Sequence, residues 1–300
     1  MSLQLSHLET KAHLYMHIAV ILFGFTAILG DLITLSAIVL VWWRVFLTSG
    51  SLVFFFKWKD ILALFETKKL GYVIGVGVIV GLHWLCFYGA IKEANATIAL
   101  VCMSTTLVFT ALLEPIIHQE AYRKLDLLLG LFMIPCFLLL VNYTPQQYIS
   151  GMGLGLLSAL LASLFSIFNK KLIESNNVFA FTFVELFSAC IFLSICLSVQ
   201  YFFFSMEIHP LIPNGFHQWF YLGLLAFLCT TLAYVLALKS LQHISAFASN
   251  MIINLEPVYG IVLAYYILGD SEHMHFQFYI GAVMIVVLIF IYPFLSKRIV

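Results

Sequence analysis

Long apolar stretches alternate with short polar gaps along almost the whole chain. Ten such stretches can be distinguished, and each is about as long as a helix that crosses a bilayer, because a hydrocarbon core about 30 Å thick requires about 20 apolar residues. The pattern therefore predicts ten transmembrane helices. They are expected at Leu14–Gly30, Ser36–Phe56, Leu70–Ile91, Ala96–Ile117, Leu125–Asn142, Gly151–Leu172, Val178–Phe204, Phe216–Leu238, Ile244–Leu268 and Phe276–Leu295.

The cationic residues are distributed unevenly over the gaps. Of the 14 lysines and arginines, 12 lie before the first stretch or in the gaps after the second, fourth, sixth, eighth and tenth stretches. Cationic loops tend to stay on the cytoplasmic side of a membrane. We therefore expect both termini and these loops in the cytoplasm. The two exceptions are Lys92, beside Glu93 in an outer turn, and Arg44, which lies inside the second stretch.

The composition leaves no room for a soluble domain. The chain is 63% hydrophobic and 9% charged, whereas soluble domains are about 25% charged. Only helices and closed barrels satisfy all backbone groups in lipid, and these stretches lack the alternation of barrel strands. We expect an all-α integral membrane protein whose first stretch is a retained helix rather than a signal peptide. The absence of long tails favours a bacterial inner (cytoplasmic) membrane.

The predicted helices divide into two halves, residues 1–145 and 146–300, with five helices each. An odd number of helices gives the two halves opposite orientations, so a repeat between them would be inverted. At an offset of 150 residues, Ala96 corresponds to Ala246, and Ser104-Thr105-Thr106 corresponds to Asn254-Leu255-Glu256. Inverted repeats around a binding site at the midplane are a recurring plan of secondary transporters.

Two charged residues lie deep within the stretches. Arg44 is eight residues into its stretch, roughly 12 Å below the outer surface, and Glu256 is twelve residues into the ninth, which leaves about 12 Å to the same surface. A charge in hydrocarbon is costly, so each requires a partner or a water-filled cavity. Either both line one cavity, where Arg44 meets a substrate carboxylate, or they form a structural ion pair.

The ninth stretch carries further polar residues at its centre. Asn250 and Asn254 are one helical turn apart and share a face, and Pro257 removes a backbone donor. These features predict a kinked polar segment that binds substrate, with Ser104 as its counterpart in the fourth stretch. Hydrogen bonding between helices is the alternative for these side chains.

Other polar and aromatic residues complete the candidate site. His83 is either a hydrogen-bonded core residue or part of the site, and Trp84 and Tyr234 are expected to form walls of the same cavity. Glu185 and Glu256 are candidates for proton coupling, because burial favours the neutral form of a carboxyl group. The alternative for Glu185 is pairing with Lys170 or Lys171.

Several classes of function are excluded by missing motifs. The chain contains no G-x-S-x-G, no H-E-x-x-H and no phosphate-binding glycine loop, so we expect no enzymatic activity and no cofactor. The six cysteines lie inside apolar stretches, and none pairs at a metal-ligand spacing. Glu272-His273-Met274-His275 is spaced like metal ligands, but without a further ligand cluster we expect no metal site. A formal net charge of zero argues against a nucleic-acid partner.

The order and spacing of these features resemble the EamA-type transporters of the drug/metabolite transporter (DMT) superfamily. The resemblance covers nearly the whole chain. Its second half is carried by Tyr234, Ser240-Leu241, Leu255-Glu256-Pro257-Val258 and Gly269-Asp270, and its first half by Phe23-Gly24, Arg44, Ala90-Ile91 and Glu120. The chain departs from the pattern at Leu107, where the first half lacks the proline, at Phe23, which replaces a frequent tryptophan, and at Val45, where phenylalanine often follows the arginine.

The resemblance implies a secondary transporter, an exporter or exchanger of small polar metabolites such as amino acids, that works by alternating access. The expected partners are a small-molecule substrate and membrane lipid, and we expect a monomer or a homodimer. A flippase for a lipid or lipid-linked sugar on the same scaffold and a non-transporting membrane receptor are the alternatives. The expected substrate-binding residues are Arg44, His83, Trp84, Ser104, Tyr234, Asn250, Asn254 and Glu256.

Overall fold

The computed structural model is helical throughout its described part, which comprises residues 2–66, 69–142, 146–173, 177–204 and 210–268 and single positions between 276 and 291. The prediction of an all-α protein is confirmed there. The α-helices are α1 (Ser2–Leu32), α2 (Ala37–Leu52), α3 (Trp58–Glu66), α4 (Leu70–Glu93), α5 (Ala96–Met103), α6 (Thr106–His118), α7 (Lys124–Asn142), α8 (Ile149–Ile173), α9 (Val178–Phe204), α10 (Gly215–Gly223), α11 (Ala233–Leu241), α12 (Ala246–Ile253) and α13 (Glu256–Ile267). Two short 3₁₀ segments, η1 (Val53–Phe55) and η2 (Gln146–Tyr148), and a π-helical segment, η3 (Leu224–Leu232), lie between them.

Seven helical segments of the described residues are long and apolar enough to cross a membrane. Two further predicted spans fall on α7 and on the pair α12 and α13. The tenth, Phe276–Leu295, lies largely outside the described residues, as do Lys297 and Arg298. A multi-pass membrane protein is therefore confirmed, while the count of ten and the cytoplasmic termini stay predictions. The seven segments are Leu8–Leu32, Ala37–Phe55, Leu70–Glu93, Ala96–His118, Gln146–Ile173, Val178–Phe202 and Gly215–Leu241.

Two membrane helices are interrupted in their middle, at equivalent places in the two halves. The first break separates α5 from α6, and the second separates α12 from α13. The helices before the breaks begin at Ala96 and Ala246, and those after the breaks begin at Thr106 and Glu256, so both pairs of starts are 150 residues apart. The predicted interruption before Pro257 is present, and the common register of the breaks supports an internal repeat.

The helices that precede the two breaks also begin with the same kind of cap. The side chain of Asn95 accepts a hydrogen bond from the backbone N–H of Ile98, and that of Ser245 accepts one from Ala248. Such caps satisfy backbone donors that have no partner within the helix. The two broken helices then pack against each other, α5 on α13 and α6 on α12. The irregular backbone at both breaks is therefore surrounded by protein, the condition under which it is tolerated at membrane depth.

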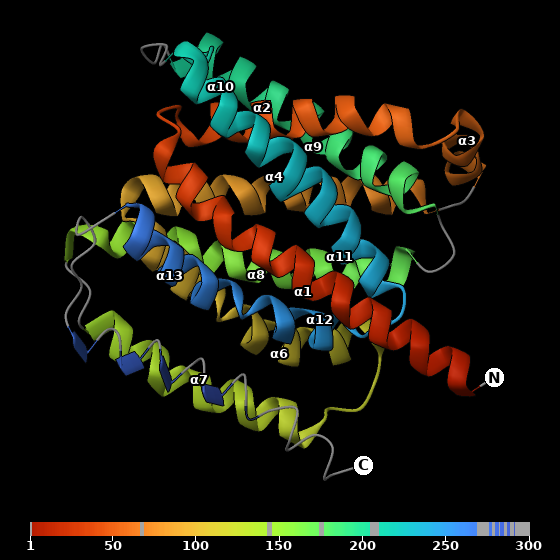
Figure 1. The fold of residues 1–300 in the computed structure, drawn as a ribbon, viewed down its shortest axis with the longest axis vertical. Helices are drawn as coiled ribbons and strands as arrows, with labels where there is room; N and C mark the ends of the chain where they lie inside the picture. The colour runs from red at the N-terminus through yellow and green to blue at the C-terminus, as the bar shows by residue number, and fades with distance from the viewer. Residues whose placement is uncertain are drawn as a thin grey trace.

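Helix α4 forms the centre of the bundle, where it packs against α8 on one side and α9 on the other. In Figure 1, α2 and α9 lie on one side of α4, and α12 and α13 lie on the other, while α1 runs diagonally across the bundle and α7 lies at the edge of the molecule. At Gly77 the two helices α4 and α9 approach closely, so that an added methyl group would collide with the backbone carbonyl of Glu185. Small residues allow this kind of close packing between membrane helices.

Replacement of Gly77 by alanine should therefore destabilise the bundle. Because the colliding atom is backbone and cannot rotate away, we expect a loss of about 1–3 kcal/mol in the free energy of unfolding. Thermal unfolding of the purified protein in detergent measures the change. Gly75→Ala on the same helix is the matched control, since nothing lies within 4 Å of its added methyl group, and equal stability of the two variants would contradict the predicted close approach.

Candidate functional site

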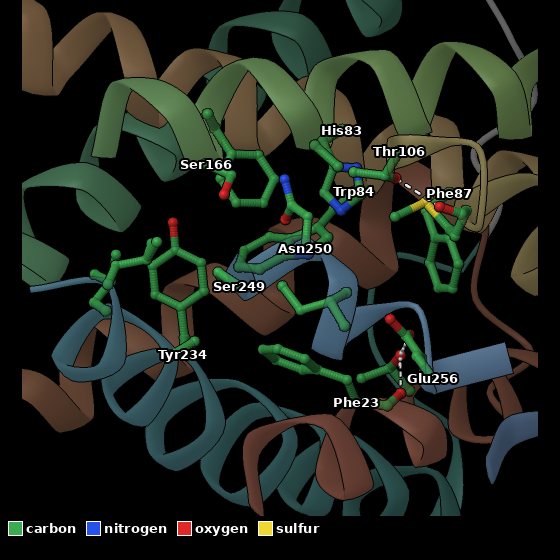
Figure 2. A pocket seen from close by; sticks show the side chains of 18 of the residues that line it. Phe23, His83, Trp84, Phe87, Thr106, Ser166, Tyr234, Ser249, Asn250 and Glu256 are labelled. Atoms are coloured by element: carbon green, nitrogen blue, oxygen red, sulfur yellow. Dashed lines mark hydrogen bonds between the residues drawn. The ribbon is translucent and has the colours of Figure 1, made fainter. Parts of the chain in front are cut away.

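A narrow cavity lies where the two broken helices meet α1, α2, α4, α8 and α11 (Figure 2). The volume open to the centre of a water molecule inside it is about 70 Å³. Six of the eight expected substrate-binding residues line it, and residues from both halves of the chain contribute. The six are Arg44, His83, Trp84, Tyr234, Asn250 and Glu256, and they are joined by polar and aromatic neighbours that include Phe23, Thr26, Phe87, Thr106, Phe165, Ser166 and Ser249.

Arg44 is held in the cavity wall by neutral groups. Its Nε donates to the hydroxyl of Thr230 at 2.6 Å, and its Nη1 donates to the hydroxyl of Tyr88 at 2.8 Å. The guanidinium carbon lies 4.0 Å from the centroid of the Trp84 ring, a cation–π contact. A guanidinium has five N–H donors, and only two of them donate within the described part of the chain. The remaining donors are available to a ligand with an acceptor group.

The acceptor for Arg44 Nε is supplied by the π-helical segment η3. Thr230 belongs to this segment, and its hydroxyl also donates to the carbonyl of Leu225, five residues back, at 2.6 Å. The neighbouring helix α2 is fixed to the same segment, because the Thr48 hydroxyl donates to the carbonyl of Ala226 at 3.0 Å. The wider π-helical turn thus positions a hydroxyl opposite Arg44. π-helical turns often occur at functional sites.

Glu256 lies in the first turn of α13, and a carboxylate is favourable at a helix N-terminus. Its Oε1 accepts a weak hydrogen bond from the Thr26 hydroxyl at 3.5 Å. The hydrogen bonds of Arg44 go to Thr230 and Tyr88 and not to Glu256. In Figure 2, Glu256 and Tyr234 lie at opposite ends of the cavity, and Asn250 lies between them. The cavity therefore offers a cation and a carboxylate without a hydrogen bond between them.

The other residues expected from the two breaks are placed differently. The side chain of Asn250 donates to the Thr110 hydroxyl at 2.8 Å and lines the cavity. Ser104 and Asn254 sit at the breaks themselves and are not among the lining residues. The Ser104 hydroxyl donates to the backbone carbonyl of Val101. Both polar atoms of the Asn254 amide are buried without a partner in the described part of the chain.

His83 is anchored to α8 although its ring faces the cavity. Its Nδ1 lies 2.9 Å from both the carbonyl and the hydroxyl oxygen of Ser158, and that hydroxyl also donates to the His83 carbonyl at 3.0 Å. These contacts agree with the alternative that His83 is a hydrogen-bonded core residue. Trp84 and Tyr234 lie edge to face with ring centroids 5.9 Å apart, so they form one continuous part of the wall.

Glu185 lies outside the cavity lining. It is fully buried, and its Oε1 accepts a hydrogen bond from Asn169 Nδ2 at 2.8 Å. Lys170, an alternative partner, donates to the backbone carbonyl of Leu241 at 2.8 Å. The neighbour of this carboxyl group is therefore an amide from α8.

The sequence interpretation missed several residues of the site. Tyr88 and Thr230 hold Arg44, and Asn169 binds Glu185. Tyr88 resembles the many other aromatic residues of the chain, and Thr230 gave no signal because hydroxyl residues are common in membrane helices. Thr106 was noted only as a neighbour of Ser104, yet it is the one that faces the cavity.

A metal site finds no support in the described residues. They contain no group of three or more His, Cys, Asp or Glu side chains that could hold a metal ion. The segment Glu272-His273-Met274-His275 lies outside the described residues. The six cysteines are free.

Comparison with known proteins identifies both halves of the chain. A sequence profile described as the EamA-like transporter family matches residues 10–143 and matches residues 149–292 as well. One solved crystal structure has 14% sequence identity to the chain, covers 97% of it and 99% of its own length, and superimposes with a TM-score of 0.68. This likeness concerns the fold alone. No protein of curated function matches the sequence. Each segment matched by the profile contains one of the two broken helices.

The contacts of His83 predict a mainly structural contribution to the cavity. His83→Phe and Ser158→Ala should each lower the free energy of unfolding by about 0.5–1.5 kcal/mol, because each removes a hydrogen bond between α4 and α8 while the remaining polar group keeps a second partner. The double variant should lose less than the sum of the two, since both changes remove the same interaction. Thermal unfolding measures all three variants. Ser166→Ala on the same helix is the control, because its hydroxyl has no recorded partner, and strictly additive losses would contradict the coupling.

Proposed function

The chain belongs to the EamA-like transporter family, and we propose that it exports or exchanges small zwitterionic metabolites such as amino acids by alternating access. Membership of a transporter family confirms the expectation that the protein is a multi-pass transporter of a small molecule and not an enzyme. The proposal adds the class of substrate and the residues that bind it. A cytoplasmic membrane as its location and a monomer or homodimer as its assembly remain part of the proposal.

The observation that carries the proposal is the arrangement of charge in the cavity. Arg44 retains free N–H donors, and Glu256 has only a weak partner at 3.5 Å. Guanidinium binds carboxylate through paired hydrogen bonds, and a carboxylate binds an ammonium group. A zwitterion placed between them satisfies both charges without adding net charge to a low-dielectric site. Asn250 and the aromatic walls would then contact the remainder of the substrate.

The small volume of the cavity is consistent with a closed state of a transport cycle. A space of about 70 Å³ for the centres of water molecules holds a few waters, so a substrate requires that the walls move apart. The walls come from both halves, and the breaks after α5 and α12 provide places where the helices can bend. We propose that one half rocks against the other around these breaks, as in other transporters built from repeats.

A thermal-shift screen of the purified protein defines the substrate class. Ligands that bind only the folded protein raise its melting temperature, so amino acids should do so while nucleosides and dicarboxylic acids should not. Transport of a fluorescent lipid without any effect of amino acids would favour the flippase. Saturable binding without transport would favour the receptor.

Replacement of Arg44 by lysine should weaken substrate binding. Lysine keeps the positive charge but presents a point charge instead of a planar pair of donors. A hydrogen bond to a charged group contributes about 1.5–3 kcal/mol, so the half-saturation concentration should rise about tenfold or more. Exchange of a radiolabelled mixture of amino acids across proteoliposomes measures this change. Unchanged exchange kinetics would remove Arg44 from the site.

Removal of the hydroxyl that orients Arg44 should have a smaller effect in the same direction. In Thr230→Val the Arg44 Nε loses its acceptor while the volume of the side chain is kept. We expect a rise of several-fold to about tenfold in the half-saturation concentration, because one hydrogen bond contributes about 0.5–1.5 kcal/mol. The control is Thr231→Val, whose hydroxyl contacts Ser51 and Ala226 instead. Equal kinetics of the two variants would contradict the orienting role.

A further inference from the structure

We propose that Glu185, Asn169 and Tyr234 form a proton-binding site that lies beside the cavity and couples a proton to transport. Three elements bring these residues together: α9 carries Glu185, α8 carries Asn169 and α11 carries Tyr234. The three residues are called the proton site below. The inference rests on the proposed transport function, and it adds the coupling ion and the group that carries it.

The amide of Asn169 connects the other two side chains. Its Nδ2 donates to Glu185 Oε1 at 2.8 Å and to the Tyr234 hydroxyl at 3.3 Å. Glu185 and Asn169 are both fully buried, and Tyr234 is 4% exposed. Both hydrogens of the amide nitrogen are thus used, and the position of the amide group is fixed from two sides.

Two atoms of the proton site lack a partner in the described part of the chain. They are Glu185 Oε2 and Asn169 Oδ1, both acceptors and both buried. Buried acceptors without a donor are costly, and an ionised carboxylate in a low-dielectric interior is costlier still when no cation lies beside it. One proton on Oε2 neutralises the carboxyl group, and it turns a buried acceptor without a partner into an O–H donor.

Among the described residues, the elements that pack against α9 bring no recorded cation to Glu185. Tyr234 is a titratable neighbour, and its hydroxyl hydrogen-bonds to the Glu185 carboxyl group. On α4, His83 is hydrogen-bonded to Ser158, and Gly77, which has no side chain, packs against the backbone of Glu185. On α2, Arg44 is bonded to Thr230 and Tyr88.

The remaining charged groups of this region are also engaged elsewhere. Lys239 of α11 lies 4.8 Å from the centroid of the Phe179 ring, and Asp60 of α3 accepts from Asn177 at 2.9 Å. Lys170 of α8 donates to the Leu241 carbonyl. Neutralisation of Glu185 therefore falls to a proton.

Tyr234 belongs both to the proton site and to the cavity wall. Its ring packs edge to face on Trp84, with centroids 5.9 Å apart, and Trp84 lies against Arg44. A displacement of α11 that opens the cavity also removes the Tyr234 hydroxyl from Asn169 and admits water to Glu185. Release of the proton is then favoured in the open state, because water solvates the carboxylate. The closed state favours the proton-bound form.

The test separates exchange from gradient-driven accumulation. Wild-type protein and Glu185→Gln are reconstituted in proteoliposomes with a radiolabelled mixture of amino acids. Glutamine resembles the protonated carboxyl group, so the variant should retain exchange at equal pH on both sides. A gradient of one pH unit should drive about tenfold accumulation by the wild type at one proton per substrate, and none by the variant. Ser188→Ala, a buried change one turn along α9 whose hydroxyl bonds to the Val184 carbonyl, should behave as the wild type.

Infrared difference spectroscopy tests the proton without any substrate. The purified wild type should show a carbonyl band of a buried protonated carboxyl group at neutral pH, and Glu185→Gln should lack it while Ser188→Ala keeps it. Absence of this band from the wild type would overturn the inference whatever the transport assay shows. The inference would also be overturned if Glu185→Gln accumulated substrate as the wild type does, or if this variant folded but lost exchange. It would be overturned as well if the wild type exchanged substrate but never responded to the pH gradient. The last result leaves the proposed transport function intact.

Discussion

The absence of water from the bilayer core is the constraint on which this structure depends. Every backbone group there must be paired within the protein, which is why the described chain is helical and why its two breaks lie against each other. A break frees backbone groups and brings polar side chains to mid-membrane, and it can persist only where other helices cover it. The mutual packing of the broken helices supplies that cover. The cavity between them follows from the same arrangement.

The same constraint explains which groups surround the buried ionisable side chains. Arg44 is surrounded by two hydroxyl groups and an aromatic face, which bind a guanidinium without neutralising it. Its charge remains available to a ligand. The proposed proton site would treat Glu185 in the opposite way, because full burial without a recorded cation beside it favours the neutral carboxyl group. On this proposal, one protein keeps a cation charged at its cavity and a carboxyl group neutral beside it. Tyr234 contacts both regions.

Much of the fold could be predicted, because membrane insertion leaves a strong signal in a single sequence. The apolar stretches predicted the helices, and the offset of 150 residues predicted which positions of the two halves correspond. The helix starts at Ala96 and Ala246 agree with that offset. Matching depths correctly placed Arg44 and Glu256 at one cavity, since a rise of about 1.5 Å per residue converts position in a helix into depth.

The depth of a residue in the membrane does not show to which side of its helix the side chain points. The sequence could not predict this direction. Ser104 and Thr106 lie at similar depth, but only Thr106 faces the cavity. Asn254 was expected to share a face with Asn250, but α12 ends at Ile253, and only Asn250 lines the cavity. The sequence by itself determined the helical class, the seven long apolar segments and the common register of the two breaks, because these follow from local hydrophobicity and spacing. Only the tertiary structure decided that Tyr88 and Thr230 hold Arg44 and that Asn169 binds Glu185. Those pairings join residues far apart in the chain, and they depend on helix rotation and packing that no local pattern encodes.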